Sequence, residues 1–352
     1  MKKLFSLIVA AATMLSAGAL PASALEAATY EEYSAQRDAV PAFPDPEERY
    51  IDYVEDSFTF HVYKDFAVLA EYNDTNAVEV TIPAEVVNSD TKEKVPVVGV
   101  VDTPFGFCHS LEKITLPDSF EHFTWYSLTN TVMVKQGSSE EPVSKLKEVA
   151  VSETNSNFTV HDRLLYSKDM KTLIGCPAAL EMKELELPEQ TETIGDYAFF
   201  ANMSLEKAVV PKTVKHINNN AFTACMKLKS VELPETITSV SGDVFFYCTS
   251  LTGVKFNGKI EEIGYGAFNH CDSLTAFEIP DTVTAIGSGA FEDSPCYENV
   301  DGIHYVGCWL VGSDDEIEQA VIREGTIGIA DMSFMVRSEC TLFDVPSSVK
   351  YI

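Results

Sequence analysis

Apolar residues recur along this chain with a period of 23 residues. Five phenylalanines keep that spacing in succession, and aliphatic residues follow the first four of them at constant offsets. The repeating unit reads F-x2-C-x2-L-x2-[IV]-x-[LIF]-P-x2-[VI]-x2-I-x4. Its phenylalanines are Phe199, Phe222, Phe245, Phe268 and Phe291. Self-similarity at a fixed period of this length is the signature of a repeat architecture.

Each part of the unit predicts a local structure. The L-x-x-I-x-L segment predicts a short strand, because its alternating apolar residues point to one side and the residue between them faces solvent. The proline ends that strand by removing a ladder donor. The A-F-x-x-C segment predicts a compact turn or helical corner that carries the aromatic ring inward. One unit buries too little apolar surface to offset the entropy of ordering it, so the units fold by stacking. We therefore predict a β-rich solenoid of short parallel strands with coils of about 23 residues.

Three segments interrupt the period and read as β-hairpins. Phe58–Tyr63 turns into Phe66–Leu69, Leu164–Tyr166 turns into Thr172–Ile174, and Ile303–Val306 turns into Trp309–Val311. A partial copy before the uninterrupted repeat contains Phe105, Cys108 and Leu116, and one after it contains Phe334, Phe343 and Val345. The prediction is a solenoid that hairpin insertions interrupt.

The ends of the chain divide it into three parts. Lys2 and Lys3, an apolar stretch and the small residues Ala22-Ser23-Ala24 predict a secretory signal peptide over residues 1–24. That stretch is short for a membrane span of about 20 residues. Residues 25–57 are expected to form an acidic N-terminal segment and linker, and residues 58–352 the solenoid. Because Ile352 lies in mid-repeat, we expect either an unusual C-terminal cap or a fragment of a longer chain.

The charge balance limits the partners. The chain has 25 basic and 54 acidic residues, a net charge of −29, and removing the two lysines of the signal peptide makes it −31. Such a charge repels nucleic acid and anionic lipid, so neither nucleic-acid binding nor membrane insertion after signal cleavage is predicted. The sequence also lacks H-E-x-x-H, G-x-S-x-G, C-x-x-C, P-loop and dinucleotide-binding motifs. We therefore expect no enzyme activity, no cofactor and no metal.

The repeat phase separates four of the eight cysteines, including Cys108 of the first partial copy, from the other four. Cys225, Cys248 and Cys271 share one repeat position, so they should stack about 4.8 Å apart with parallel Cβ vectors, outside the usual disulfide range. Buried free thiols are predicted there, and serine at Cys248 should destabilise more than alanine because its hydroxyl would lack a partner. The sequence leaves the pairing of the other group open: Cys176, Cys296, Cys308 and Cys340.

These motifs resemble the bacterial BspA-like leucine-rich-repeat family over roughly residues 58–352. The segments IGDYAFFANMSLEKAVVPKTVKHI, AFTACMKLKSVELPETITSV and AFNHCDSLTAFEIPDTVTAIGSGAF carry the resemblance. It implies a leucine-rich-repeat solenoid in a secreted or cell-surface protein. Some members are similar to adhesins that bind host matrix proteins or other microbes, and the family has no catalytic motif to carry over.

A solenoid presents an extended face on which outward residues vary while the apolar frame stays constant. We therefore expect the outward residues of the strands to bind an extracellular protein or glycan. The alternative is a structural spacer of a bacterial surface layer without a specific ligand. The candidate residues are Glu206, Lys207, Val209, Lys229, Ser230, Glu232, Thr252, Lys255, Thr275 and Glu278.

Overall fold

The computed structural model describes residues 49–352 apart from residues 102, 124, 137–138, 315–316 and 335–341. Residues Tyr50–Ile352 form one compact unit. The predicted signal peptide and Cys340 lie outside the described residues. Strand structure begins with β1 (Ile51–Glu55), earlier than the expected start of the solenoid at Phe58.

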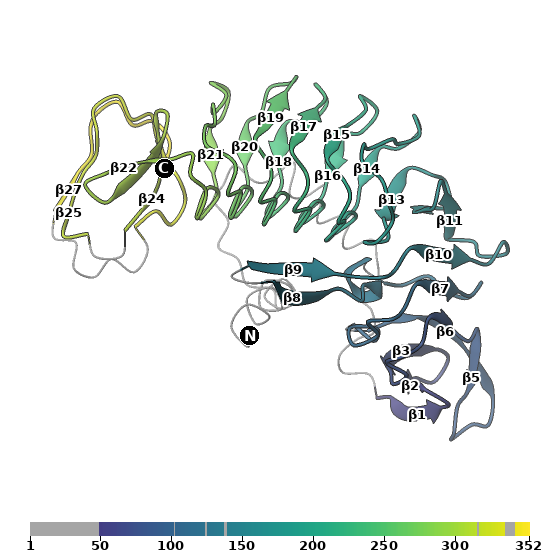
Figure 1. The fold of residues 1–352 in the computed structure, drawn as a ribbon. Coiled ribbons are helices and arrows are strands. Elements are labelled where there is room, and N and C mark those ends of the chain that lie inside the picture. The colour runs from purple at the N-terminus through teal and green to yellow at the C-terminus, as the bar shows by residue number, and fades with distance from the viewer. Residues whose placement is uncertain (1–48, 102, 124, 137–138, 315–316, 335–341) are drawn as a thin grey trace. The chain divides into compact units, whose positions relative to one another are not determined.

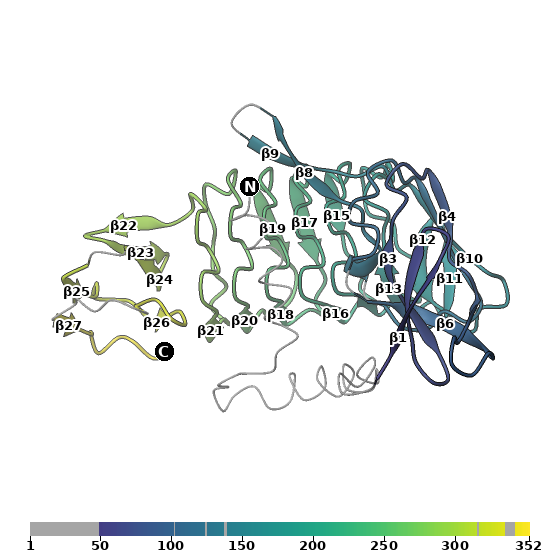
Figure 2. The same cartoon turned by 90° about the horizontal axis from the view of Figure 1, so that it is seen from below.

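Two columns of short parallel strands run along the uninterrupted repeat (Figures 1 and 2). The first column is β15 (Lys207–Val209), β17 (Ser230–Leu233) and β19 (Gly253–Phe256). The second is β14 (Thr193–Ile194), β16 (His216–Ile217), β18 (Ser239–Val240), β20 (Glu262–Ile263) and β21 (Ala285–Ile286). Ala208 pairs with Val231 and Val231 with Val254, so residues 23 positions apart lie side by side. The predicted solenoid of parallel strands is confirmed.

The A-F-x-x-C segment forms a turn on the third side of each coil, so the alternative of a helical corner is wrong. Asn220 and Ala224, on either side of Phe222, both have φ of 59°. The same pair of left-handed residues recurs in every coil from Tyr197 to Asp293. The backbone N–H of Phe222 donates to the carbonyl oxygen of Val244 in the next coil at 3.0 Å. Within the described residues the one helix is a short 3-10 helix, η1 (Trp125–Leu128), elsewhere in the chain.

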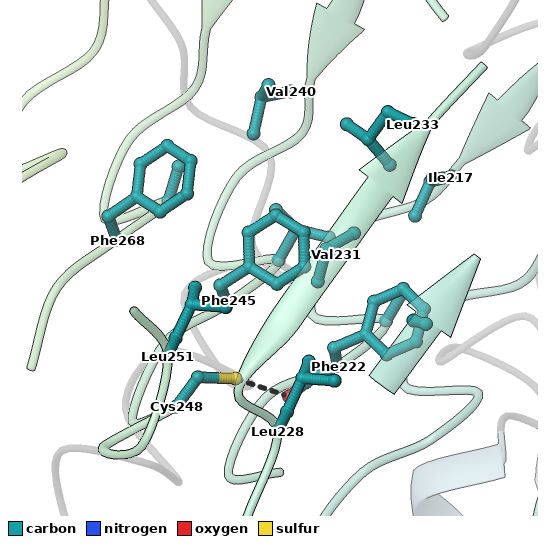
Figure 3. Packing of buried hydrophobic residues seen from close by; sticks show 14 of the residues in the cluster. Ile217, Phe222, Leu228, Val231, Leu233, Val240, Phe245, Cys248, Leu251 and Phe268 are labelled. Carbon is teal, nitrogen blue, oxygen red and sulfur yellow. Dashed lines mark hydrogen bonds between the residues drawn. The ribbon is translucent and has the colours of Figure 1, made fainter. Parts of the chain in front are cut away.

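The repeat phenylalanines form a continuous stack inside the coils. Adjacent ring centroids lie between 5.0 and 5.7 Å apart, and their planes are inclined by 4° to 22°. Figure 3 shows Phe222, Phe245 and Phe268 in this arrangement, with Leu228 and Leu251 beside them. All five residues are fully buried. Each coil therefore shares its core with both neighbours, which is why a single unit could not fold alone.

The predicted column of buried free thiols is confirmed. Cys225, Cys248 and Cys271 have no exposed surface and form no disulfide. Each thiol donates to the carbonyl oxygen of a phenylalanine in a preceding coil: Cys225 to Phe199 (3.0 Å), Cys248 to Phe222 (3.2 Å, dashed in Figure 3) and Cys271 to Phe245 (3.3 Å). Burial raises the pKa of all three thiols. They are therefore protonated donors rather than reactive thiolates.

Ser294 occupies the same position in the following coil and corrects one expectation. It is buried, and its hydroxyl donates to the carbonyl oxygen of Phe268. A serine hydroxyl in this column therefore has an acceptor already in place. The expectation that serine at Cys248 costs more than alanine is withdrawn, because it assumed an unpaired hydroxyl.

The cysteines outside the column differ in exposure. Cys176 is buried, which raises the pKa of its thiol to about 12. Cys296 is half-buried, with a pKa raised by burial to about 11, and Cys308 is exposed. All three are free within the described part of the chain.

The three predicted hairpins are confirmed, and each has an additional strand before it. They form the antiparallel sets β1–β2 (Phe58–Val62)–β3 (Ala67–Tyr72), β11 (Phe158–His161)–β12 (Leu164–Ser167)–β13 (Thr172–Gly175) and β22 (Glu298–Val300)–β23 (Ile303–Val306)–β24 (Trp309–Ser313). In each set the last strand pairs in parallel with a solenoid strand: β3 with β6 (Lys94–Val100), β13 with β14, and β24 with β26 (Gly328–Ile329). The insertions are therefore extensions of the solenoid sheets.

The remaining strands belong to the outer coils. Before the uninterrupted repeat lie β4 (Glu79–Thr81), β5 (Glu85–Val87), β7 (Lys113–Leu116), β8 (Val132–Gln136), β9 (Ser139–Val143) and β10 (Glu148–Val151). After it lie β25 (Gln319–Val321) and β27 (Leu342–Asp344). The parallel sheets β10–β7–β4 and β25–β27 contain the partial copies at Phe105 and Phe343.

Candidate binding surface

Eight of the ten predicted site residues lie on the outer side of β15, β17 and β19 or directly precede one of these strands. We call these eight residues the strand face. They form three rows that cross the three coils. The strand pairing aligns two of the rows, and backbone hydrogen bonds from Lys229 to Glu206 and from Thr252 to Lys229 align the third. The rows are Glu206–Lys229–Thr252, Lys207–Ser230–Gly253 and Val209–Glu232–Lys255, with Gly253 completing the middle row.

Strand geometry explains why these side chains point outward. On β15, Lys207 and Val209 are exposed while Ala208 between them is fully buried. On β17, Val231 and Leu233 are each 2% exposed, and their neighbours Ser230 and Glu232 face solvent. This two-residue alternation fixes the outward set once the buried set is fixed. The apolar repeat thus determines where the variable side chains lie.

Charges on the strand face pair between neighbouring coils. Glu206 lies 2.6 Å from the ammonium of Lys229, and Glu232 lies 2.7 Å from that of Lys255. Hydrogen bonds from these lysines lower the pKa of both carboxyl groups. The pairs are exposed to solvent, which screens them, so they contribute little to stability. Their main effect is to make the face nearly neutral within a strongly acidic chain.

Sequence reasoning missed residues of the preceding coil that extend this face. Glu184 forms a parallel bridge with Lys207, and their charged groups are 3.6 Å apart. Lys183 lies 3.5 Å from Glu206. Lys183 and Glu184 stand 23 positions before Glu206 and Lys207, so the repeat spacing itself could have identified them.

A second row of paired charges lies on the other strand column. The carboxylate of Glu192 accepts hydrogen bonds from Lys215 at 2.7 Å and Lys171 at 2.9 Å. These bonds lower the pKa of Glu192 to about 2. Residues of this column were not among the predicted site residues, although they share the same exposure.

Two predicted site residues do not belong to the strand face. Thr275 and Glu278 are exposed, but the segment that holds them forms no strand, and the sheet ends at β19. Phe277 lies between them, with its ring centroid 4.8 Å from Phe268 and 5.0 Å from Phe291. The antiparallel set that starts at β22 follows this coil, so no parallel strand lies on its other side to extend the ladder. The candidate surface therefore spans three strands rather than four.

None of the helices among the described residues is long and apolar enough to cross a membrane. In the same residues, no group of three or more His, Cys, Asp and Glu side chains is arranged to hold a metal ion.

The repeat defines the family. Residues 177–298 match the BspA type leucine rich repeat region in six copies. This part of the chain is therefore a BspA-type leucine-rich-repeat solenoid, and the resemblance inferred from the sequence is confirmed there. No curated protein matches the chain.

Several solved bacterial structures match much of this chain. A leucine rich cell surface protein from Faecalibacterium prausnitzii A2-165 has 21% identity over 85% of this chain and 77% of its own, with a TM-score of 0.38. A leucine-rich repeat protein from Bacteroides ovatus has 19% identity over 80% of this chain, with a TM-score of 0.43. This chain spans 61% of the Bacteroides ovatus protein. A leucine-rich repeat protein from Eubacterium ventriosum has 18% identity over 71% of this chain and 96% of its own, with a TM-score of 0.38.

Proposed function

We propose that this protein is a secreted or cell-surface scaffold that binds an extracellular protein or glycan through the strand face. The observation that carries the proposal is the register of β15, β17 and β19, which holds outward side chains in three rows above a buried frame. Repeat proteins use such extended surfaces for recognition. The signal-peptide pattern of residues 1–24 supports the location.

The composition of the strand face suits a partner that is not strongly charged. Its carboxylates and ammonium groups already pair across coils, as at Glu232 and Lys255. Val209, at one end of the same row, is 42% exposed and offers apolar surface beside those charges. Apolar contact surrounded by polar groups is the usual anatomy of a protein interface.

Binding to a defined panel tests the proposal. Purified wild-type protein is passed over immobilised host matrix proteins and mucin, and compared with a double variant, Lys207→Glu with Lys255→Glu. The variant should lose the partner because both substitutions place unpaired negative charge on the strand face. Lys215→Glu, on the second strand column, serves as the matched control and should bind as wild type does. If the double variant bound as strongly as wild type, the strand face would not be the binding surface.

A structural spacer of a surface layer is the second candidate. The observation that favours it is the pairing of Glu206 with Lys229 and of Glu232 with Lys255, which satisfies these charges without any ligand. A spacer would keep its localisation and cellular phenotype after the double charge reversal. A specific binder would lose its partner under the same change.

A further inference from the structure

The third side of the solenoid differs in charge from the strand face. It consists of the turns at residues 195–201, 218–224, 241–247, 264–270 and 287–293, which we call the corner face. These segments contain four carboxylates and no lysine or arginine: Asp196, Asp243, Glu292 and Asp293. Among the described residues, Asp293 and His270 form the ion pair on this face, with 3.3 Å between Oδ2 of Asp293 and Nε2 of His270. Unlike the strand face, the corner face has no ammonium or guanidinium group of its own to balance its carboxylates.

Tyr265 and Asp243 lie side by side at the centre of the corner face. A Cβ atom on Gly242 would lie 2.4 Å from the Tyr265 ring, so that ring covers the backbone of the preceding coil. A Cβ atom on Gly266 would lie 2.0 Å from Oδ1 of Asp243, so the carboxyl group covers the backbone of the following coil. The two glycines thus allow an aromatic ring and a carboxyl group to cross between adjacent coils. The ring remains 40% exposed.

Further rings and charges surround this pair. Burial, together with the charges of Asp243 and Asp196, raises the pKa of the Tyr265 hydroxyl to about 12. Burial and the same two carboxylates also raise the pKa of the Tyr197 hydroxyl. The ring centroid of Tyr197 lies 5.1 Å from that of Tyr126 on η1. On the corner face, the half-buried Tyr197 and Tyr265 therefore lie near the carboxylates of Asp196 and Asp243.

Burial gives Asp243 an unusual protonation equilibrium. Its side chain is 9% exposed, and this desolvation raises its pKa to about 7. A positive charge beside it would have the opposite effect, because an opposite charge favours the ionised form. Among the described residues, desolvation is the cause of the raised pKa, and no positive charge offsets it.

We propose that the corner face around Tyr265, Asp243 and Asp196 is a second docking site, which takes lysine or arginine side chains of a partner protein. Aromatic faces attract cations through the ring quadrupole, and neighbouring carboxylates add a direct electrostatic attraction. These segments contain no lysine or arginine of their own that would compete with the side chains of a partner. The same charge disfavours sulfated or sialylated glycans and phosphate. The inference rests on the proposed role in protein binding and gives it a second surface with a defined chemistry.

The test uses the full chain and a fluorescein-labelled octa-arginine peptide, with affinity measured by fluorescence anisotropy at pH 8 and constant ionic strength. Asp243→Asn should weaken binding about five- to tenfold, because it removes a negative charge beside the exposed ring of Tyr265. Tyr265→Leu keeps the bulk of the side chain, removes the aromatic face and should weaken binding to a similar extent. Asparagine is compatible with this position because Asn220 occupies it one coil earlier at φ of 59°.

Glu278→Gln is the matched control, because it removes one exposed carboxylate outside the corner face. It should bind the peptide within twofold of wild type. An equal loss in Glu278→Gln would show general attraction to an acidic chain and overturn the proposal. Unchanged affinity in either corner variant, or displacement of the peptide by a neutral oligosaccharide, would also overturn it. The binding assay of the strand face uses other variants and other ligands. A negative result with octa-arginine would therefore not decide the outcome of that assay.

Discussion

Replacing Asp243 with asparagine should stabilise the protein at neutral pH. The carboxyl group of Asp243 is almost fully buried against Gly266, and desolvation raises its pKa from 3.8 to about 7. Asparagine has nearly the same shape and carries no charge. It also tolerates the left-handed backbone at this position, where φ is 50°. The substitution therefore removes the cost of ionising a buried acid while leaving the packing in place.

The sign and size of the effect follow from the two pKa values. Well below pH 4 the carboxyl group is protonated in both the folded and the unfolded chain, so it does not penalise folding. As the pH rises from about 4 to about 7, the unfolded chain ionises first, and the wild-type protein loses stability until the folded-state pKa is passed. The two pKa values differ by about 3, and each whole unit corresponds to about 1.4 kcal/mol. The wild type should therefore lose up to about 4 kcal/mol over this range through Asp243.

Urea denaturation followed by circular dichroism, at pH values from 4 to 8, measures this difference. Asp243→Asn and wild type should have similar stability at pH 4, and the variant should become increasingly more stable up to pH 8. Glu278→Gln removes an exposed carboxylate and should show no such divergence from wild type. A constant difference between Asp243→Asn and wild type across the pH range would refute the burial of this carboxyl group between the coils.

Four further predictions concern the frame of the solenoid. Phe245→Ala should lower the free energy of unfolding by about 3–5 kcal/mol, because it opens a cavity in the aromatic stack. The thiol of Cys248 should react slowly with a thiol reagent in the folded protein and fully in denaturant, since burial keeps it protonated and covered. Serine at that position should cost no more than alanine, because the carbonyl of Phe222 accepts its hydrogen bond. Gly266→Ala should cost about 1–3 kcal/mol, since φ there is 58° and the new Cβ would meet Asp243.

Neighbouring residues provide the controls. Phe246 is half-buried outside the stack, so Phe246→Ala should cost clearly less than Phe245→Ala in the same denaturation assay. Cys308 is exposed and should label quickly in the folded protein. No atom beyond its chain neighbours lies within 4 Å of a Cβ built on Gly253, so Gly253→Ala should be tolerated. Equal costs within either pair of variants, or fast labelling of Cys248, would contradict the coil packing.

The sequence predicted the interior of the solenoid well because the interior imposes the period. Phe222, Leu228 and Cys225 are buried as their repeat positions require, since every coil meets the same neighbours. The strand face followed from the same argument, because alternation along β17 leaves Ser230 and Glu232 outside. The predicted strand does not form at Thr275 and Glu278, where the repeat pattern persists although the sheet has ended.

The details between the repeats were harder to predict. The first strand of each hairpin set lacks the repeat pattern, although Asp301-Gly302 is a typical two-residue hairpin signal before β23 and has positive φ at both residues. The contact between Tyr265 and Asp243 depends on glycines in neighbouring coils, which only the stacked structure brings together. Asp243 was not identified as a functional residue because a single acid in a repeat turn ordinarily faces water.

The affinity of a Val209→Arg variant for whichever panel protein the wild type binds tests the central claim most directly. Val209 lies on the strand face and is 42% exposed, so arginine should block docking without disturbing the core. Val321, on the parallel strand β25 and 58% exposed, provides the matched substitution outside that face. The account predicts that Val209→Arg lowers affinity at least tenfold while Val321→Arg binds as wild type does, with both variants keeping the wild-type melting temperature. Undiminished binding by Val209→Arg would contradict the assignment of the strand face as the binding surface.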